Sequence, residues 1–208
     1  MRIKDIKIQE CHEPLIEVGK ACPDLIVKLN SKSAKRIYPA YLRKTVVEMI
    51  CTAKTYLPEG MTFIINDAWR PRATQEEIRK SFIAGFTKKY PEWSERMVSN
   101  EVDKYVAPFS GKYASGHMAG AAVDLRLAKN GRKIPMKSSR LTYQENAQSH
   151  QPKLPRYIKK NRQIMFDALS KAGLSNFPKE YWHWSYGDVQ WAKRNSKETA
   201  IYGVIEKY

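Results

Sequence analysis

Apolar residues recur every three or four positions in several stretches of the chain, which is the spacing of one face of a helix. One stretch covers residues 41–57 and ends at Pro58-Glu59-Gly60, a combination that stops a helix. Another covers residues 158–172 and is followed by Gly173, the residue type that most often closes a helix. We therefore expect one amphipathic helix in the N-terminal third of the chain and another near its C-terminal end.

Two further helices are expected between these. Thr74 followed by Glu77 matches a capping box, in which two side chains satisfy the N–H groups of a helix start, and the apolar face continues to Phe86. Pro91 has the fixed backbone angle that suits the first turn of a helix. The second of these two helices is therefore expected to open at Pro91 and to carry apolar residues up to Tyr105.

Three strands are expected, at residues 61–66, which are rich in β-branched residues, at residues 121–127, and at the aromatic residues 181–186. The tight-turn pair Asn130-Gly131 joins the second of these to residues 132–136 in a hairpin. Loops are expected at residues 108–120, which are rich in Gly and Ser, and at the polar residues 144–155.

The grouping of these elements predicts the fold class. Helices and strands occur in groups, and the hairpin is the clear strand connection. This favours the α+β class, with a small antiparallel β-sheet flanked by helices, over a doubly wound parallel sheet. No repeat, low-complexity tract or linker divides the sequence, so residues 1–208 are expected to form a single domain.

The composition is strongly basic. The chain has 37 Lys and Arg against 21 Asp and Glu, a formal net charge of +16. Nucleic acid, an anionic membrane surface and an acidic substrate are all compatible with this surplus. The positive residues are spread along the chain, however, and the sequence has no Gly-rich phosphate loop, zinc-finger spacing or RNA-binding aromatic signature. Nucleic acid is therefore not the favoured partner.

Hydropathy and cysteine content bear on location. No window approaches the ~18 consecutive apolar residues of a membrane span. Charges near the N-terminus replace the apolar stretch of a secretory signal, which predicts a cytoplasmic location, although a periplasmic protein whose signal had been removed would have the same pattern. Cys11, Cys22 and Cys51 show no C-x-x-C spacing, so we expect reduced, structural thiols.

One histidine and one aspartate lie close together in unusual surroundings. Asp124 is inside an apolar strand, where an ionised carboxylate is costly unless a cation or several donors meet it. His117 is on the adjoining loop, where Gly116 and Gly120 let the backbone bend back toward the strand. An imidazole and a carboxylate together suit zinc. The structural alternative is an aspartate bonded to a turn and an ordinary loop histidine.

A second histidine, His183, follows Glu180 by three residues in an aromatic stretch. His183 is a candidate third ligand, which would leave a fourth position for water, as in catalytic zinc sites. Glu180 could then take a proton from water and pass it to the leaving amine. The alternative is an edge strand with a hydrogen-bonded histidine.

Arg70 directly follows the predicted strand at residues 61–66 and is fixed by Pro71. A guanidinium in this place is well suited to meet an oxyanion. The alternative is an arginine in a surface ion pair.

Taken together and in this order, these segments resemble the zinc D-alanyl-D-alanine dipeptidases of the VanX type. These belong to the wider family of metallo-DD-carboxypeptidases and dipeptidases that share a fold with the hedgehog signalling domain. The resemblance covers about residues 61–192. It is strongest at Asp67-Ala68-Trp69-Arg70-Pro71, at the S-x-H-x-x-G-x-x-x-D block from Ser115 to Asp124, at Ile134-Pro135-Met136 and at Glu180-Tyr181-Trp182-His183.

The resemblance implies a zinc peptidase with the hedgehog and DD-peptidase type of fold. It implies one Zn²⁺ per chain, bound by His117, Asp124 and His183. It further implies that Glu180 is the general base and then the proton donor, and that Arg70 stabilises the tetrahedral oxyanion. Ser115, two residues before the first ligand, would help to hold the substrate.

The sequence departs from the family where specificity is decided. The dipeptidases carry a tyrosine and an Asn-Phe-x-Gly stretch that residues 24–30 lack, and an aspartate for the substrate ammonium that is missing from residues 141–145. Glu145 is the candidate substitute. Without such an anion, the enzyme would accept longer peptides.

Three hypotheses follow. The first is hydrolysis of the D-Ala-D-Ala dipeptide by metal-activated water. The alternative is a peptidoglycan DD- or LD-carboxypeptidase that acts on longer stem peptides of the bacterial cell wall. A hypothesis from another class, based on the charge of +16, is a basic binding module for nucleic acid or a cell-wall polymer. The oligomeric state is left open.

Overall fold

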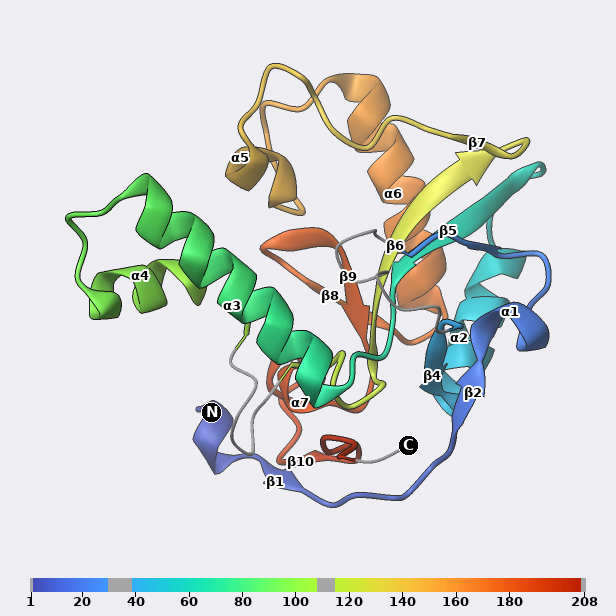
Figure 1. Ribbon diagram of the computed structural model, residues 1–208. Coiled ribbons are helices and arrows are strands. Elements are labelled where there is room, and N and C mark those ends of the chain that lie inside the picture. Colours follow the sequence, from blue (N-terminus) through green and yellow to red (C-terminus); the bar gives the residue numbers. More distant parts are fainter. Residues whose placement is uncertain (1, 30–38, 108–114, 207–208) are drawn as a thin grey trace.

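A six-stranded sheet lies at the centre of the computed structural model, which describes residues 2–29, 39–107 and 115–206 (Figure 1). Its strand order is β3-β5-β6-β9-β8, with β7 paired to β6. Only the β3–β5 pairing is parallel within the described part of this sheet. The predicted α+β class with a mainly antiparallel sheet is therefore confirmed. The strands of the sheet are β3 (Ile26–Val27), β5 (Met61–Asp67), β6 (Ala122–Lys129), β7 (Arg132–Lys133), β8 (Ser175–Phe177) and β9 (Glu180–Ser185).

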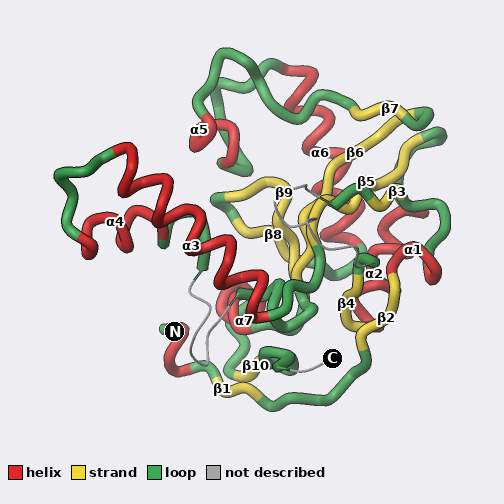
Figure 2. Tube along the Cα trace, viewed as in Figure 1, coloured by secondary structure: helices red, strands yellow, loops and turns green. Residues whose placement is uncertain are grey.

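Two small strand pairs lie outside the main sheet. β1 (Lys7–Ile8) runs parallel to β10 (Thr199–Ala200), and β2 (Leu15–Glu17) runs antiparallel to β4 (Tyr41–Arg43). Figure 2 shows these pairs apart from the central group of strands. The helices are α1 (Val18–Ala21), α2 (Lys44–Thr55), α3 (Arg72–Lys89), α4 (Glu95–Val102), α5 (Tyr143–Ala147), α6 (Arg156–Lys171) and α7 (Val189–Arg194), with a 3-10 turn at Ile3–Asp5.

The main core lies between one face of the sheet and the helices α2 and α6 (Figure 1). Side chains alternate between the two faces of a strand. On β6, Val123, Leu125 and Leu127 are fully buried in this core. The same alternation turns Asp124 and Arg126 to the opposite face, where the polar site is built.

Several helix starts differ from the sequence expectation. Residues 41–43 form β4 rather than the beginning of a helix, and α2 starts at Lys44. The expected capping box at Thr74 is wrong, because α3 begins at Arg72 and Thr74 is buried within its first turn. The helix expected from Pro91 begins at Glu95 instead, where the Ser94 hydroxyl caps it by accepting a bond from the Met97 N–H.

The strand predictions hold better than the loop predictions. The hairpin of β6 and β7 is confirmed, and Asn130 (φ 49°) and Gly131 (φ 74°) have the positive angles of a tight hairpin turn. The segment 144–155, expected to be irregular, begins with most of α5, which a capping box of Thr142 and Glu145 starts. Of the loop expected at residues 108–120, residues 108–114 lie outside the described part of the chain.

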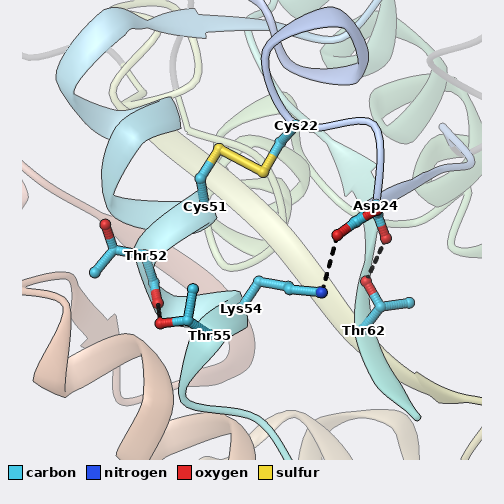
Figure 3. Close-up of a disulfide and its surroundings, with 7 residues drawn as sticks. All are labelled: Cys22, Asp24, Cys51, Thr52, Lys54, Thr55 and Thr62. Carbon is cyan, nitrogen blue, oxygen red and sulfur yellow. Dashed lines mark hydrogen bonds and ion pairs between the residues drawn. A yellow bond between two sulfur atoms is a disulfide. The ribbon is translucent and has the colours of Figure 1, made fainter. Parts of the chain in front are cut away.

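Two of the three cysteines form a disulfide. Cys22, at the end of α1, is joined to Cys51 of α2, with 5.9 Å between their Cα atoms (Figure 3). Cys11 is free and exposed. The expectation of three reduced thiols is therefore wrong, because spacing along the sequence does not show which cysteines the fold brings together. Among the described residues, no helix combines the length and apolar character that crossing a membrane requires.

Candidate metal centre and active site

One row of polar residues crosses three strands of the sheet. Asp67 at the end of β5 pairs with Asp124 of β6, and Asp124 pairs with His183 of β9. The register of β5 shifts between Ile65 and Asp67, and such bulges re-aim side chains next to functional sites. The sheet thus places two carboxylates and an imidazole next to each other.

His117 reaches this row from the turn before β6. The Gly116 carbonyl accepts bonds from the N–H groups of Ala119, Ala121 and Ala122, which folds the turn back onto the strand. The Nδ1 atom of His117 lies 2.8 Å from the Ala68 carbonyl. This carbonyl fixes the orientation of the imidazole ring, as a carbonyl or carboxylate bonded to the far nitrogen of a metal-bound histidine does.

The other nitrogen of this ring points at Asp124. His117 Nε2 is 3.3 Å from Asp124 Oδ1, and His183 Nδ1 is 3.0 Å from the same oxygen. The ligand atoms of the three residues all lie within 4.8 Å of one another. Zinc bonds of about 2.0–2.2 Å at tetrahedral angles place two ligand atoms roughly 3.3 Å apart. The donor set and its spacing therefore fit a zinc ion, and the structure brings together the three ligands that the sequence suggested.

The electrostatics of this cluster favour an ionised carboxylate. Burial alone would raise the pKa of Asp124, but the charges and hydrogen bonds of His117 and His183 lower it well below its usual range.

Glu180 begins β9 and lies beside the cluster. Its Oε2 atom is 4.0 Å from His183 Nδ1, and its side chain keeps 27% of its surface exposed. Burial raises the pKa of Glu180, and the Asp124 charge adds to this, while His183 and Arg70 act in the opposite direction. A carboxyl with a raised pKa next to a solvent-facing metal cluster is suited to proton transfer.

Arg70 is held in place by two side chains that the sequence analysis did not single out. Asp67 Oδ2 accepts bonds from Arg70 Nε (2.9 Å) and Nη2 (2.7 Å), and Gln75 Oε1 accepts one from Nη1 (2.9 Å). Gln75 is fully buried and donates in turn to the Ala107 carbonyl. Burial lowers the pKa of Arg70, but the bonded Asp67 and the charges of Asp124 and Glu180 raise it, and the net result is a pKa above the usual value. Asp67 also pairs with Asp124 across the sheet, so the ion pair brings the guanidinium to the side of the cluster. The position of Asp67 three residues before Arg70 was the available signal.

Ser115 and Glu145 have local roles. The Ser115 hydroxyl accepts a 3.3 Å bond from the His117 N–H, so it supports the turn of the first ligand, and its contact with a substrate stays a prediction. The Glu145 carboxylate accepts bonds from the N–H and hydroxyl of Thr142 and pairs with Lys153. The structure thus engages Glu145 at the N-terminus of α5 rather than leaving it for a substrate ammonium.

Three known proteins are similar to this chain. A D-alanyl-D-alanine dipeptidase of Synechocystis sp. (strain ATCC 27184 / PCC 6803 / Kazusa) is 23% identical over 237 residues, covering 97% of this chain and 95% of its own. The solved structure of VanYB with D-alanine-D-alanine has a TM-score of 0.49 at 15% identity, covering 75% of this chain and 77% of its own. A VanY D,D-pentapeptidase variant from a VanB-type vancomycin resistance cassette, solved with Zn(II), has a TM-score of 0.49 at 12% identity, covering 93% of each chain.

A family model settles the relationship. The peptidase M15 model, described as D-ala-D-ala dipeptidase, matches residues 20–200 and so spans the sheet, the cluster, Glu180 and Arg70. The resemblance seen in the sequence motifs is confirmed over a longer stretch than those motifs cover. This chain belongs to the D-Ala-D-Ala dipeptidase family of peptidases, M15.

Proposed function

We propose that this protein is a zinc-dependent peptidase that hydrolyses the D-Ala-D-Ala dipeptide. The observation that carries the proposal is the convergence of His117, Asp124 and His183, with Glu180 on one side of them and Arg70 nearby. Membership of the dipeptidase family supports the same activity. One Zn²⁺ per chain would be held by these two histidines and the aspartate, and when bound it would supply Lewis-acid activation of water.

The chain's own residues supply the other parts of the reaction. The raised pKa of Glu180 suits this carboxyl to accept a proton from water and to return it to the leaving amine. Arg70 presents a fixed, always charged guanidinium to the oxyanion that forms on the scissile carbonyl. Because Asp67 and Gln75 already hold this guanidinium, little reorganisation is needed when negative charge develops.

A second candidate is a DD- or LD-carboxypeptidase that trims longer peptidoglycan stem peptides. The engagement of Glu145 with Thr142 and Lys153 favours it, because a strict dipeptidase needs an anion for the free amino group of its substrate. Both candidates use the same cluster, base and arginine, and they differ in the length of the accepted peptide.

The test is a metal analysis of the purified protein together with an assay of two substrates. We expect about one zinc per chain, and release of free alanine from D-Ala-D-Ala that a chelator abolishes and added zinc restores. Release from a pentapeptide stem alone would replace the dipeptidase proposal with the carboxypeptidase. No release from either peptide, with binding of a cell-wall polymer or nucleic acid retained after zinc removal, would favour the basic binding module.

A further inference from the structure

The turn that carries His117 is held by one arginine of β4. The N–H of Arg43 donates to the Gly120 carbonyl at 2.8 Å, and Arg43 Nε donates to the Ala119 carbonyl at 2.9 Å. These two carbonyls follow His117 closely in the chain. Arg43 is 4% exposed, and a buried bond of this kind is costly to leave unmade. The two bonds therefore fix the backbone directly after the first ligand.

The other end of β4 acts on the imidazole ring of the same histidine. The Tyr41 carbonyl accepts a 2.9 Å bond from the Trp69 N–H. The neighbouring Ala68 carbonyl lies 2.8 Å from His117 Nδ1 and orients the ring. The His117 carbonyl accepts a 3.0 Å bond from the Arg70 N–H, which joins the two segments a second time. One short strand thus supports both the backbone of His117 and the segment to which its ring is bonded.

The rest of the Arg43 guanidinium is anchored away from the site. Its Nη1 atom donates to the Glu13 carbonyl at 2.5 Å. Its Nη2 atom lies 3.0 Å from Glu10 Oε2 and 3.4 Å from the Gly203 carbonyl. A guanidinium directs its N–H groups in a fixed plane, whereas a lysine ammonium is a point charge on a flexible stem. Arginine can therefore tie two distant segments to the turn, and lysine can replace its charge but not this geometry.

The turn lies in direct contact with the strand pair of β2 and β4. Gly120 has a φ of 66°, and a Cβ atom added there would lie 2.4 Å from Leu15 Cδ2 of β2. The same Cβ would lie 3.6 Å from the Arg43 backbone nitrogen. Closely packed groups transmit a displacement to their neighbours, because no gap takes it up. A change in the position of the Arg43 side chain therefore reaches the turn.

We propose that Arg43 is a positioning residue of the metal centre, which holds His117 in the orientation that binds zinc. Its bonds to Ala119 and Gly120 fix the backbone that carries this histidine. From that backbone, His117 Nε2 reaches to within 3.3 Å of Asp124 Oδ1. The inference rests on the proposed function in one respect, that the cluster binds zinc. A buried arginine that only stabilised the fold would leave the zinc affinity of the folded protein unchanged.

The test is Arg43→Lys, which keeps a positive charge for Glu10 and the backbone bond to Gly120 but loses the Nε donor at the Ala119 carbonyl. Competition with a chromogenic chelator measures the zinc dissociation constant of the folded variant. We expect zinc binding to weaken by about 10- to 100-fold, the usual effect of losing a group that orients a metal ligand. The visible spectrum of the Co²⁺-substituted protein should change as well, because it reports the geometry of the ligands.

A matched control is available in Arg79 of α3, which is also buried, pairs with Asp103 at 2.7 Å and donates to the Val106 carbonyl at 3.0 Å. Figure 1 shows α4, which directly precedes Asp103, across the molecule from β4. Arg79→Lys should lower the unfolding temperature of the metal-free chain, as Arg43→Lys does. It should leave the zinc dissociation constant within about twofold of the wild type, because distant sites act independently.

A second pair of variants covers the case in which Arg43→Lys does not fold. Glu10→Gln keeps Arg43 and removes only the charge of one anchor, so it should weaken zinc binding in the same direction by about three- to fivefold. Asp103→Asn does the same to Arg79 and should leave zinc binding unchanged.

Wild-type zinc affinity in folded Arg43→Lys, or in Glu10→Gln where the first variant does not fold, would overturn the inference and leave the proposed function intact. Losses of equal size in the variants of the Arg79 pair would overturn it too. A wild-type protein that binds no zinc would overturn both. A wild-type protein that binds zinc but releases no alanine from either peptide would overturn the proposed function alone, since the zinc titrations still decide the role of Arg43.

Discussion

Asp67 and Arg70 form a two-point ion pair at the end of β5, with Asp67 Oδ2 lying 2.9 Å from Arg70 Nε and 2.7 Å from Nη2. Both side chains are largely buried. Since Asp67 pairs with Asp124 across the sheet, the strand register that builds the metal cluster also sets the position of the arginine. The cluster and Arg70 thus depend on one row of residues across the sheet.

The first prediction concerns this pair. Arg70→Ala should lower kcat by about 10²- to 10³-fold, the usual effect of losing an oxyanion donor, with zinc content unchanged. Asp67→Asn should lower kcat by about 10-fold, because the guanidinium stays but loses its fixed orientation. Steady-state kinetics and metal analysis check both. The exposed pair of Arg72 and Glu206 provides the control, and Glu206→Gln should leave kcat unchanged. An equal effect of Glu206→Gln would contradict the role of Asp67.

The second prediction concerns Glu180. Glu180→Ala should keep zinc bound and lose about 10²- to 10⁴-fold in kcat, the contribution of a general base. Zinc content and single-turnover rates measure the two effects separately. Glu101 of α4, which pairs with Lys104 just after this helix, offers a control substitution of the same kind. A Glu180→Ala enzyme that retains its turnover would refute the assignment.

The third prediction concerns a carboxylate away from the site. Burial raises the pKa of Glu13, but bonds from the hydroxyls of Thr45 and Tyr202 and the charge of Arg43 outweigh this, so its pKa lies below the usual 4.5. A group whose pKa is lowered by folding stabilises the folded chain at any pH above its pKa in the unfolded state. This contribution is lost as the pH falls through the pKa of the group in the folded state.

Glu13→Gln should therefore lower the free energy of unfolding by about 1–2 kcal/mol at pH 7, and by progressively less below pH 4.5. Urea unfolding of the variant and the wild type across this pH range measures the difference. Glu17→Gln, which removes the ion pair with the exposed Lys20, should change little. A deficit for Glu13→Gln that is independent of pH would contradict the prediction.

The fourth prediction concerns the disulfide. Titration of the denatured, unreduced wild type should find one thiol per chain, that of Cys11. Cys51→Ser opens a link between residues 29 positions apart and should cost about 3 kcal/mol of unfolding free energy, whereas Cys11→Ser should be neutral. Three thiols in the wild type, or equal stability of the two variants, would contradict the link.

The parts of the fold that the sequence predicts are those that local pattern determines. The apolar periodicity of α2 and α6 and the Asn130-Gly131 turn arise within one element each, and both helices and the hairpin are present. The residues of β4 were expected to begin a helix, because they continue the apolar periodicity of α2. They form a strand instead, because contacts with distant groups decide their structure. Arg43, for example, donates to the Ala119 carbonyl and pairs with Glu10. The location of the protein and its single-domain organisation stay predictions.

The same distinction applies to the site. Residues with distinctive chemistry, such as His117, Asp124 and His183, could be found from the sequence because few other residue types bind zinc. Gln75 could not, because its role depends on a bond to Arg70 that an ordinary helical pattern conceals.

The parallel pairing of β1 with β10 has a consequence for how the chain is made. Lys7 pairs with Thr199 and Ile8 with Ala200, so the two strands of this pair are 192 positions apart in the sequence. During synthesis, which proceeds from the N-terminus, the first strand emerges from the ribosome long before that partner exists. The nascent chain must therefore carry β1 unpaired until residues 199–200 have also been synthesised, so this strand pair closes only after the residues of the central sheet have been made.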